Sequence, residues 1–251
     1  MLSLITTCKN RLQYLKQTLP LMLKQSMAEV IVVDYGCEQG TADWVKEHHP
    51  AAKVVQVNDD PIFCLARARN MGARNSSHNF FCFVDSDVMI HEQLGEWLWI
   101  HKDPKKFYLY PMQNANENEL TGFSIVAKDH FLKTGGFDEA FKGWGGEDND
   151  FYERLKRIGL SEAFIPQNSI SAVSHDSTVR QLREGSGGYE TVSEALSMNH
   201  LYRLIKRDIW QITNSDIDLE NRKQLFQHIF LKTKKQSYKS KISSKWQSTS
   251  R

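Results

Sequence analysis

The stretch FFCFVDSDVMI, residues Phe80 to Ile90, decides the fold of this chain. Its apolar start is typical of a buried β-strand, and two carboxylates, Asp85 and Asp87, follow where the apolar run stops. Alternation along an extended backbone places both acids on the same side, clear of an interior in which an unpaired charge is costly. Strands that are apolar on both faces occur in parallel sheets covered by helices. The stretch therefore predicts an α/β fold with polar groups at a strand end.

The rest of the chain repeats this pattern of short apolar runs and helical periodicity. Alternation of this kind predicts βαβ units and a doubly wound, mainly parallel central sheet flanked by helices. Strands are predicted at residues 2–7, 29–36, 53–57 and 80–85, and then within FYLYPM, GFSIVA, EAFIP and ISAVSH. Helices are predicted at residues 11–25, 41–48, 64–75 and 147–158, followed by C-terminal helices at 190–210 and 216–232.

Composition limits the function classes. With 251 residues, 40% hydrophobic, 25% charged and a net charge of +2, the chain has the composition of a soluble enzyme and no strong charge for nucleic acid. No apolar run approaches the roughly 20 residues of a membrane span, and MLSLITT lacks the flanks of a signal sequence, so we expect a cytoplasmic protein.

Four cysteines without CxxC spacing predict reduced thiols. Residues 234–251, rich in lysine, predict a basic flexible tail, with contact to an anionic membrane surface as the alternative.

The two aspartates suggest metal chemistry. In doubly wound folds, ligands gather beyond the carboxyl ends of the strands. Hard carboxylate oxygens at such an edge suit Mg²⁺ or Mn²⁺ held together with phosphate oxygens. The alternative is a solvated turn that only ends the strand.

A second informative stretch is FKGWGGEDNDFYERL, residues 141–155. Acids at a helix start stabilise the first turn through the helix dipole, which accounts for one or two of them. The flanking glycines predict close approach of the backbone to a ligand, and Trp144 offers a flat face for a sugar ring. A carboxylate beside such a face is suited to take a proton from a sugar hydroxyl.

Six pieces of the sequence together resemble metal-dependent glycosyltransferases of the GT-A fold, particularly the β-1,4-galactosyltransferase type and bacterial chondroitin-polymerase-like domains. The pieces occur in the family's order and cover roughly residues 1–180. They are CKNRLQYL, VVDYG, ARARNMGA, FVDSD, GGFDEAFKGWGGEDNDFYERL and AVSHD.

The resemblance implies a set of roles. Asp148 would be the catalytic base, with Glu147 beside the transferred or accepting sugar. The metal ligands, for Mn²⁺ or Mg²⁺, would be Asp85, Asp87 and His175. The nucleotide-sugar would be bound by Thr6, Arg11, Asp34, Arg67, Arg69, Asp85, Ser86 and Trp144.

The implied reaction moves a hexose or N-acetylhexosamine, with galactose or N-acetylgalactosamine favoured, from a UDP-sugar to a hydroxyl of a glycan or lipid-linked glycan. The outcome would be inverting, in a bacterial enzyme of surface polysaccharide synthesis that touches the inner face of the plasma membrane through its tail. The chain would divide into a GT-A domain (1–180), an acceptor-side loop with C-terminal helices (181–233) and the tail (234–251).

Two alternatives come from other classes of protein. FVDSDV also resembles the nucleophile motif of haloacid-dehalogenase-type phosphatases, although that motif usually ends the first strand and here three strand patterns precede it. The Trp and Gly features alone would also suit a non-catalytic sugar-binding module. Sugar-nucleotide pyrophosphorylases need a glycine-rich loop after the first strand, and TTCKNRLQYL contains no glycine.

Overall fold

A computed structural model of the chain describes residues 1–60, 62–91, 93–112, 120–173, 189 and 191–249, with side chains described as far as residue 234. The strands of the main sheet are β1 (Leu2–Cys8), β2 (Ala28–Asp34), β3 (Lys53–Gln56), β4 (Phe80–Phe83), β6 (Lys106–Leu109), β7 (Ser124–Ala127) and β8 (Ser161–Phe164). A small second sheet pairs β5 (Val88–Ile90) with β9 (Ile170–Ala172). The helices are α1 (Leu12–Leu23), α2 (Thr41–His48), α3 (Leu65–Arg74), α4 (Leu94–His101), α5 (Lys128–Lys133), α6 (Glu147–Arg157), α7 (Val192–Thr213) and α8 (Leu219–Thr249).

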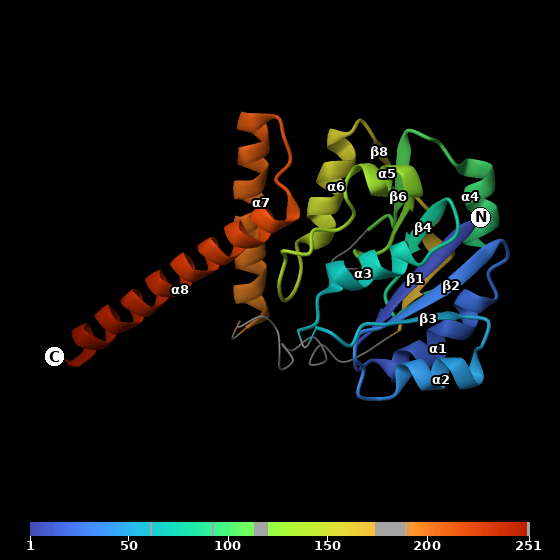
Figure 1. The fold of residues 1–251 in the computed structure, drawn as a ribbon, viewed down its shortest axis with the longest axis horizontal. Coiled ribbons are helices and arrows are strands. Elements are labelled where there is room, and N and C mark those ends of the chain that lie inside the picture. Colours follow the sequence, from blue (N-terminus) through green and yellow to red (C-terminus); the bar gives the residue numbers. More distant parts are fainter. Residues whose placement is uncertain (61, 92, 113–119, 174–188, 190, 250–251) are drawn as a thin grey trace.

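The main sheet has the strand order β3-β2-β1-β4-β7-β6-β8 (Figure 1). Its first four strands in this order are parallel, as the βαβ pattern predicted. β7 runs antiparallel to both β4 and β6, and β8 runs parallel to β6. The carboxyl ends of β1, β2, β3 and β4 therefore share one edge of the sheet, where ligands gather in such folds.

The two faces of the sheet carry separate hydrophobic cores because side chains alternate along each strand. Leu2 and Leu4 of β1 pack with the apolar face of α1, whereas Ile5 packs in the core that α3, α5 and α6 share. Close packing of α3 depends on Gly72, since a Cβ there would lie 2.3 Å from Ile5 Cγ2. This contact fixes α3, and with it Arg69, above the strand ends.

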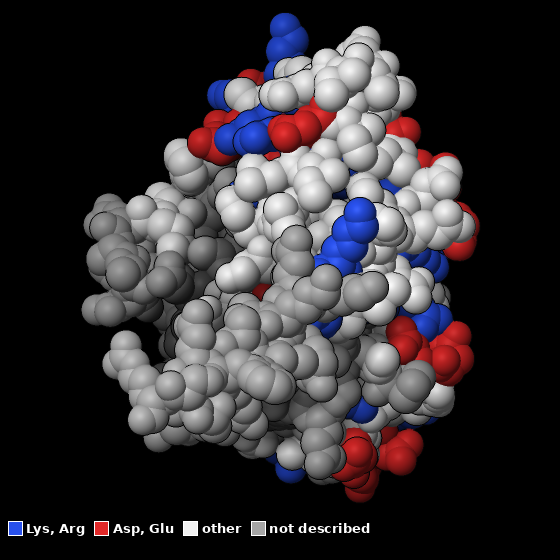
Figure 2. Space-filling view, turned by 90° about the vertical axis from the view of Figure 1, so that its left-hand side faces the viewer, with Lys and Arg blue, Asp and Glu red and all other residues white. Residues whose placement is uncertain are grey.

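A third core joins the C-terminal helices to the loop before α6. Phe141 packs with Tyr202 of α7 and Phe226 of α8 in this core, and in Figure 1 the distal part of α8 extends away from the rest of the molecule. On the side of the molecule turned towards the viewer in Figure 2, the described acidic and basic side chains are interspersed. None of the helices within the described part of the chain is long and apolar enough to cross a membrane.

The predicted α/β fold is confirmed, with differences in detail. β5, α4 and α5 were not predicted, because each is a short element of three to eight residues. The last helix, predicted to end at residue 232, continues to Thr249, so the segment predicted as a flexible tail is helical over most of its length. All four cysteines are free, as the sequence predicted.

Candidate active site

Asp85 and Asp87 follow β4 at the shared edge of the sheet. The backbone of the intervening Ser86 is held by α1, because the Thr18 hydroxyl donates a hydrogen bond of 2.8 Å to the Ser86 carbonyl oxygen. Arg11, at the start of α1, donates from Nη1 to Asp87 Oδ2 at 2.5 Å. The strand end is thus tied to the loop after β1, as expected for residues that act on one ligand.

Arg69 of α3 joins the two motifs that the sequence singled out. Its Nη2 donates to Asp85 Oδ1 at 3.1 Å, and its Nη1 forms an ion pair with Asp148, while Glu147 Oε1 lies 4.0 Å from the same Nη1. We call Asp85, Glu147 and Asp148 around Arg69 the acidic cluster. The Arg69 side chain is 2% exposed, but that of Asp85 is 32% exposed. The cluster is therefore anchored in the protein interior and open to solvent on one side.

The acidic cluster holds more negative than positive charge, and this shifts its titration. Burial raises the pKa of Glu147 to about 8, helped by the charge of Asp148 and opposed by Arg69. Burial also raises the pKa of Asp148, and the Arg69 guanidinium opposes the shift. A carboxylate with a raised pKa is a stronger base than an ordinary aspartate, which suits proton abstraction.

A second group of charges lies on the other side of the first turn of α6. Lys206 Nζ of α7 donates to Asp138 Oδ2 at 2.6 Å and forms an ion pair with Asp150. Asp150 also accepts from Arg154 Nε at 2.9 Å, and Arg222 Nε of α8 lies 3.9 Å from Asp138 Oδ2. We call these five residues the Lys206 cluster. Burial alone would raise the pKa of Asp150, but Arg154 and Lys206 lower it to about 2, so Asp150 stays charged.

The glycines before α6 have a structural role that was not predicted. Gly143, Gly145 and Gly146 have φ values of 70°, 80° and 98°, the left-handed region that favours glycine. A Cβ at Gly145 would lie 2.7 Å from Leu196 Cδ2 of α7. The backbone therefore approaches α7 closely. Close packing against a helix therefore also requires glycine here, and the approach of this backbone to a ligand stays a prediction.

The remaining predicted nucleotide-sugar residues lie in different surroundings. Thr6 is buried in β1, and its Oγ1 has no hydrogen-bond partner among the described residues. Both carboxylate oxygens of Asp34 accept backbone N–H groups, from Cys37 at 2.8 Å and Ala42 at 2.9 Å, which orders the turn between β2 and α2. Trp144 is 43% exposed and so presents an open ring.

Arg67 is separate from the acidic cluster. It pairs with Asp59 at 2.7 Å and Asp60 at 3.2 Å in the segment between β3 and α3. The Tyr35 hydroxyl donates to the same Asp60 at 2.6 Å. Arg67 thus lies beyond the carboxyl ends of β2 and β3, while Arg69 faces the acids.

Part of the predicted metal site falls outside the described residues, since His175 is not among them. Among the side chains that are described, no group of three His, Cys, Asp or Glu lies in a position to hold a metal ion. The two other predicted ligands follow the strand end, where Asp85 pairs with Arg69 and Asp87 pairs with Arg11.

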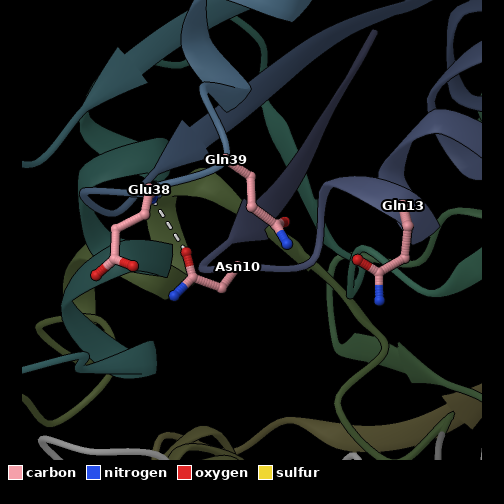
Figure 3. Close-up of a pocket in the computed structure, with 4 residues that line it drawn as sticks. All are labelled: Asn10, Gln13, Glu38 and Gln39. Carbon is pink, nitrogen blue, oxygen red and sulfur yellow. Dashed lines mark hydrogen bonds between the residues drawn. The ribbon is translucent and has the colours of Figure 1, made fainter.

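An open hollow of about 550 Å³ lies at the loops that follow β1 and β2 (Figure 3). It is lined by Asn10, Gln13, Glu38 and Gln39, and the Glu38 backbone N–H donates to Asn10 Oδ1 at 3.1 Å. The lining of the hollow includes no residue of the acidic cluster, so the hollow and the acidic cluster are separate features of this edge. The polar lining of the hollow, at the carboxyl ends of parallel strands, is suited to bind a polar part of a ligand.

Two family models match overlapping parts of the chain. Glycosyl transferase family 2 matches residues 3–115, and the N-terminal domain of galactosyltransferase matches residues 105–177. Among solved structures, GalNAc-T7 with UDP, GalNAc and Mn²⁺ has a TM-score of 0.64 and 14% sequence identity, over 91% of this chain and 54% of that one. The chain has the GT-A glycosyltransferase fold.

Curated relatives of this GT-A chain are also glycosyltransferases. Validoxylamine A glucosyltransferase of Streptomyces hygroscopicus subsp. jinggangensis is 26% identical over 220 residues, covering 64% of this chain and 52% of the relative. Beta-1,4-galactosyltransferase 2 of Cricetulus griseus is 25% identical over 134 residues, covering 47% of this chain and 36% of the relative. This GT-A chain spans about half or less of the length of these relatives. The resemblance stated from the sequence is confirmed in that two glycosyltransferase family models match the chain and its fold is GT-A.

Several residues of the GT-A site were missed from the sequence. Gly122 leaves room beside the acids, since a Cβ there would lie 2.5 Å from Arg69 Nη2 and 2.9 Å from Asp85 Oδ2. The Tyr152 hydroxyl donates to the Thr121 carbonyl at 3.2 Å, below the acidic cluster. Asn199 and Lys206 of α7 contact the loop before α6 and the acids that flank it. These residues belong to no local sequence motif. The buried positions of α7 do recur at helical spacing, which indicates that one face of this helix packs against the rest of the protein.

Proposed function

We propose that this chain is a metal-dependent, inverting glycosyltransferase that moves galactose or N-acetylgalactosamine from a UDP-sugar to a hydroxyl of a glycan acceptor. The acceptor is a growing or lipid-linked glycan, in a bacterial pathway of surface polysaccharide synthesis. The protein works in the cytoplasm, at the inner face of the plasma membrane. The GT-A fold and the matching glycosyltransferase family models support the reaction class. The proposed donor, acceptor, metal and location rest on the resemblance of the sequence motifs.

One observation carries the proposal: Arg69 joins Asp85 of the strand end to Asp148 of α6. Acids that lie 63 positions apart in the sequence thereby meet at one opening. The reaction needs one group near the leaving diphosphate and another near the incoming hydroxyl, and this arrangement supplies both.

The residues of the chain then have definite tasks. Asp148 takes the proton of the acceptor hydroxyl as its oxygen forms a bond to the anomeric carbon. The bond from that carbon to the diphosphate oxygen breaks on the opposite face, and the electron pair leaves with UDP. Arg11, whose side chain is 21% exposed, is the cation beside the strand end that meets the negative charge of the diphosphate.

Asp85 and Asp87 would hold the divalent ion, Mn²⁺ or Mg²⁺, with His175 as the further ligand. The described residues fit this role, because carboxylate oxygens are ligands for hard cations and the Asp85 side chain is 32% exposed. When bound, such an ion stabilises the negative charge that the diphosphate gains on leaving. In the structure the same carboxylates are paired with Arg69 and Arg11.

The test is calorimetry of the purified protein with UDP, UDP-Gal, UDP-GalNAc, UDP-GlcNAc and UDP-GlcA, each with and without manganese. We expect binding that requires manganese, strongest for UDP-Gal or UDP-GalNAc. A protein that binds free sugars but no UDP-sugar would be a sugar-binding module, and hydrolysis of phosphate monoesters without UDP binding would indicate a phosphatase.

The Asp87→Ala variant tests the metal assignment. A unit charge pair at 4 Å contributes about 4 kcal/mol at an effective dielectric of 20, which corresponds to about a thousandfold in rate. We expect a loss of that order in transfer, together with loss of manganese-dependent UDP binding. Asp129→Ala, which removes an exposed acid of α5, is the matched control. Unchanged manganese-dependent binding in Asp87→Ala would contradict the assignment.

A further inference from the structure

The loop from Asp138 to Asp150 carries the catalytic carboxylates, and α7 holds it at several points. At its two ends, Asp138 and Asp150 both pair with Lys206. The Tyr202 hydroxyl, one turn earlier on α7, also donates to Asp138 Oδ2, at 2.9 Å. One face of α7 thus binds both ends of the loop through ion pairs and a hydrogen bond.

Asn199 holds the middle of the same loop. Its Nδ2 lies 3.0 Å from the carbonyl oxygen of Lys142, 3.1 Å from that of Trp144 and 2.6 Å from that of Gly145. The side-chain amide has two hydrogens to share among these three acceptors. Asn199 and Lys206 are seven positions apart and therefore lie on the same face of α7.

The surroundings of Asn199 indicate that hydrogen-bond donation is what the position requires. The residue is 1% exposed, and its Oδ1 has no hydrogen-bond partner among the described residues. A buried acceptor without a partner is unfavourable, so the donor side of the amide must more than offset that loss. The orientation of the amide follows from the three carbonyl oxygens, which would repel Oδ1 in the flipped state.

The contacts of Asn199 also determine where the carboxylates of Glu147 and Asp148 lie. Gly146 follows the three carbonyls, and its carbonyl oxygen accepts the first hydrogen bond of α6, from the Asp150 N–H at 3.0 Å. Glu147 and Asp148 occupy the turn that this bond closes. The conformation of residues 142–146 therefore sets the direction in which both carboxylates leave the helix.

We infer that Asn199 is a positioning residue for the transfer reaction. By donating to the carbonyls of residues 142, 144 and 145, it fixes the turn from which Asp148 and Glu147 face Arg69. The inference rests on the proposed function for its catalytic consequence. Asn199 touches neither substrate nor the reacting atoms, and it acts through the backbone of the loop. A displacement of a catalytic group by about 1 Å reduces rate by as much as a hundredfold.

Two near-isosteric variants separate hydrogen-bond donation from space filling. Asn199→Leu keeps a similar volume and removes both hydrogens, and Asn199→Asp keeps the shape but offers one hydrogen at most, and only when protonated. If the residue fills space, both variants behave like the parent. If it donates, both lose turnover by roughly ten- to a hundredfold while UDP-sugar affinity stays at the parent value.

Leu196→Ala is the matched control, because Leu196 lies on the same helix and packs on the same loop through apolar atoms alone. Asn199→Ala is added in case the larger substitutions unfold the protein, since alanine favours the helix and introduces no clash. Circular dichroism melting identifies the variants that remain folded.

Hydrogen exchange of the peptide covering residues 141–150 gives a readout that does not depend on activity. We expect faster exchange there in the Asn199 variants and parent exchange in the control. Parent exchange and parent turnover in both Asn199→Asp and Asn199→Leu would overturn the inference. Faster exchange in a protein whose parent form transfers no sugar would uphold the clamp on the loop and refute the proposed function instead.

Discussion

Asp148 and Asp150 lie two residues apart on the first turn of α6 and belong to two charge clusters of opposite character. Asp148 shares one guanidinium, that of Arg69, with two other carboxylates. Asp150 shares Lys206 with Asp138 and has Arg154 beside it, in a cluster of two acids and three cations. Burial raises the pKa of Asp148 and that of Glu147, whereas the cations lower the pKa of Asp150 to about 2.

The difference teaches how to read buried charge in this fold. A cluster in which every acid is matched by a cation holds elements together and needs nothing further. A cluster with excess acid is unfavourable for the protein alone and becomes favourable when a cation or a proton arrives. The same helical turn thus has one side on which the acids are paired with cations and one side on which acids are in excess.

The largest effect is expected from Asp148→Asn, which removes the proton acceptor from the acidic cluster and leaves its shape intact. Loss of a general base reduces turnover by about 10²- to 10⁴-fold. Initial rates with a UDP-sugar and a glycan acceptor measure the loss, and calorimetry measures donor affinity, which we expect to be retained. Asn149→Ala, at the exposed neighbouring position, is the control. Normal turnover with weakened donor binding would give Asp148 a binding role instead.

Lys206→Met tests the matched cluster in the same way. It leaves Asp138 and Asp150 buried without their shared cation, and breaking a buried pair costs about 3–5 kcal/mol of the free energy of unfolding. Urea denaturation measures the change. In Lys156→Met the lost pair is exposed, with Glu162 at 2.6 Å, and such pairs contribute about 0–1 kcal/mol. Equal stability of the two variants would mean that the Lys206 cluster does not hold α7 to α6.

Glu147→Gln gives an effect that appears only as a change with pH. The pKa of Glu147 is about 8 in the folded protein against an ordinary 4.5, so the folded state keeps a proton that the unfolded state releases. Between pH 4.5 and 8 this carboxyl therefore makes the parent less stable as pH rises. Glutamine does not titrate, so the stability of the variant relative to the parent should increase across this range. Urea denaturation at pH 5, 6, 7 and 8 measures it, and parallel curves would contradict the pKa shift.

The sequence predicted those parts of the molecule that depend on local pattern. The first strands and helices were found within a few residues, and α2 was found at its observed bounds, because alternation and helical periodicity are properties of a short window. Short elements such as β5 and α5 were missed, since three to six residues are too few to show a period.

For the candidate site, the sequence identified the acidic residues but not the side chains that fix their positions. DSD and GGEDND were recognised as motifs, and Arg69 was expected to contact the nucleotide. Its near-complete burial between Asp85 and Asp148 depends on the packing of α3 on β1, which no local pattern reports. The contacts of Asn199 and Lys206 span more than 50 positions and have no signal in a short window.

The packing of α7 on the loop before α6 has a practical consequence for anyone who trims or transplants this catalytic unit. A version cut at residue 180 would keep every recognised motif, yet it would uncover Phe141 and strip Asp138 and Asp150 of their lysine. Grafting GGEDND onto another scaffold would have the same defect. The portable unit is the motif together with the helix that braces it.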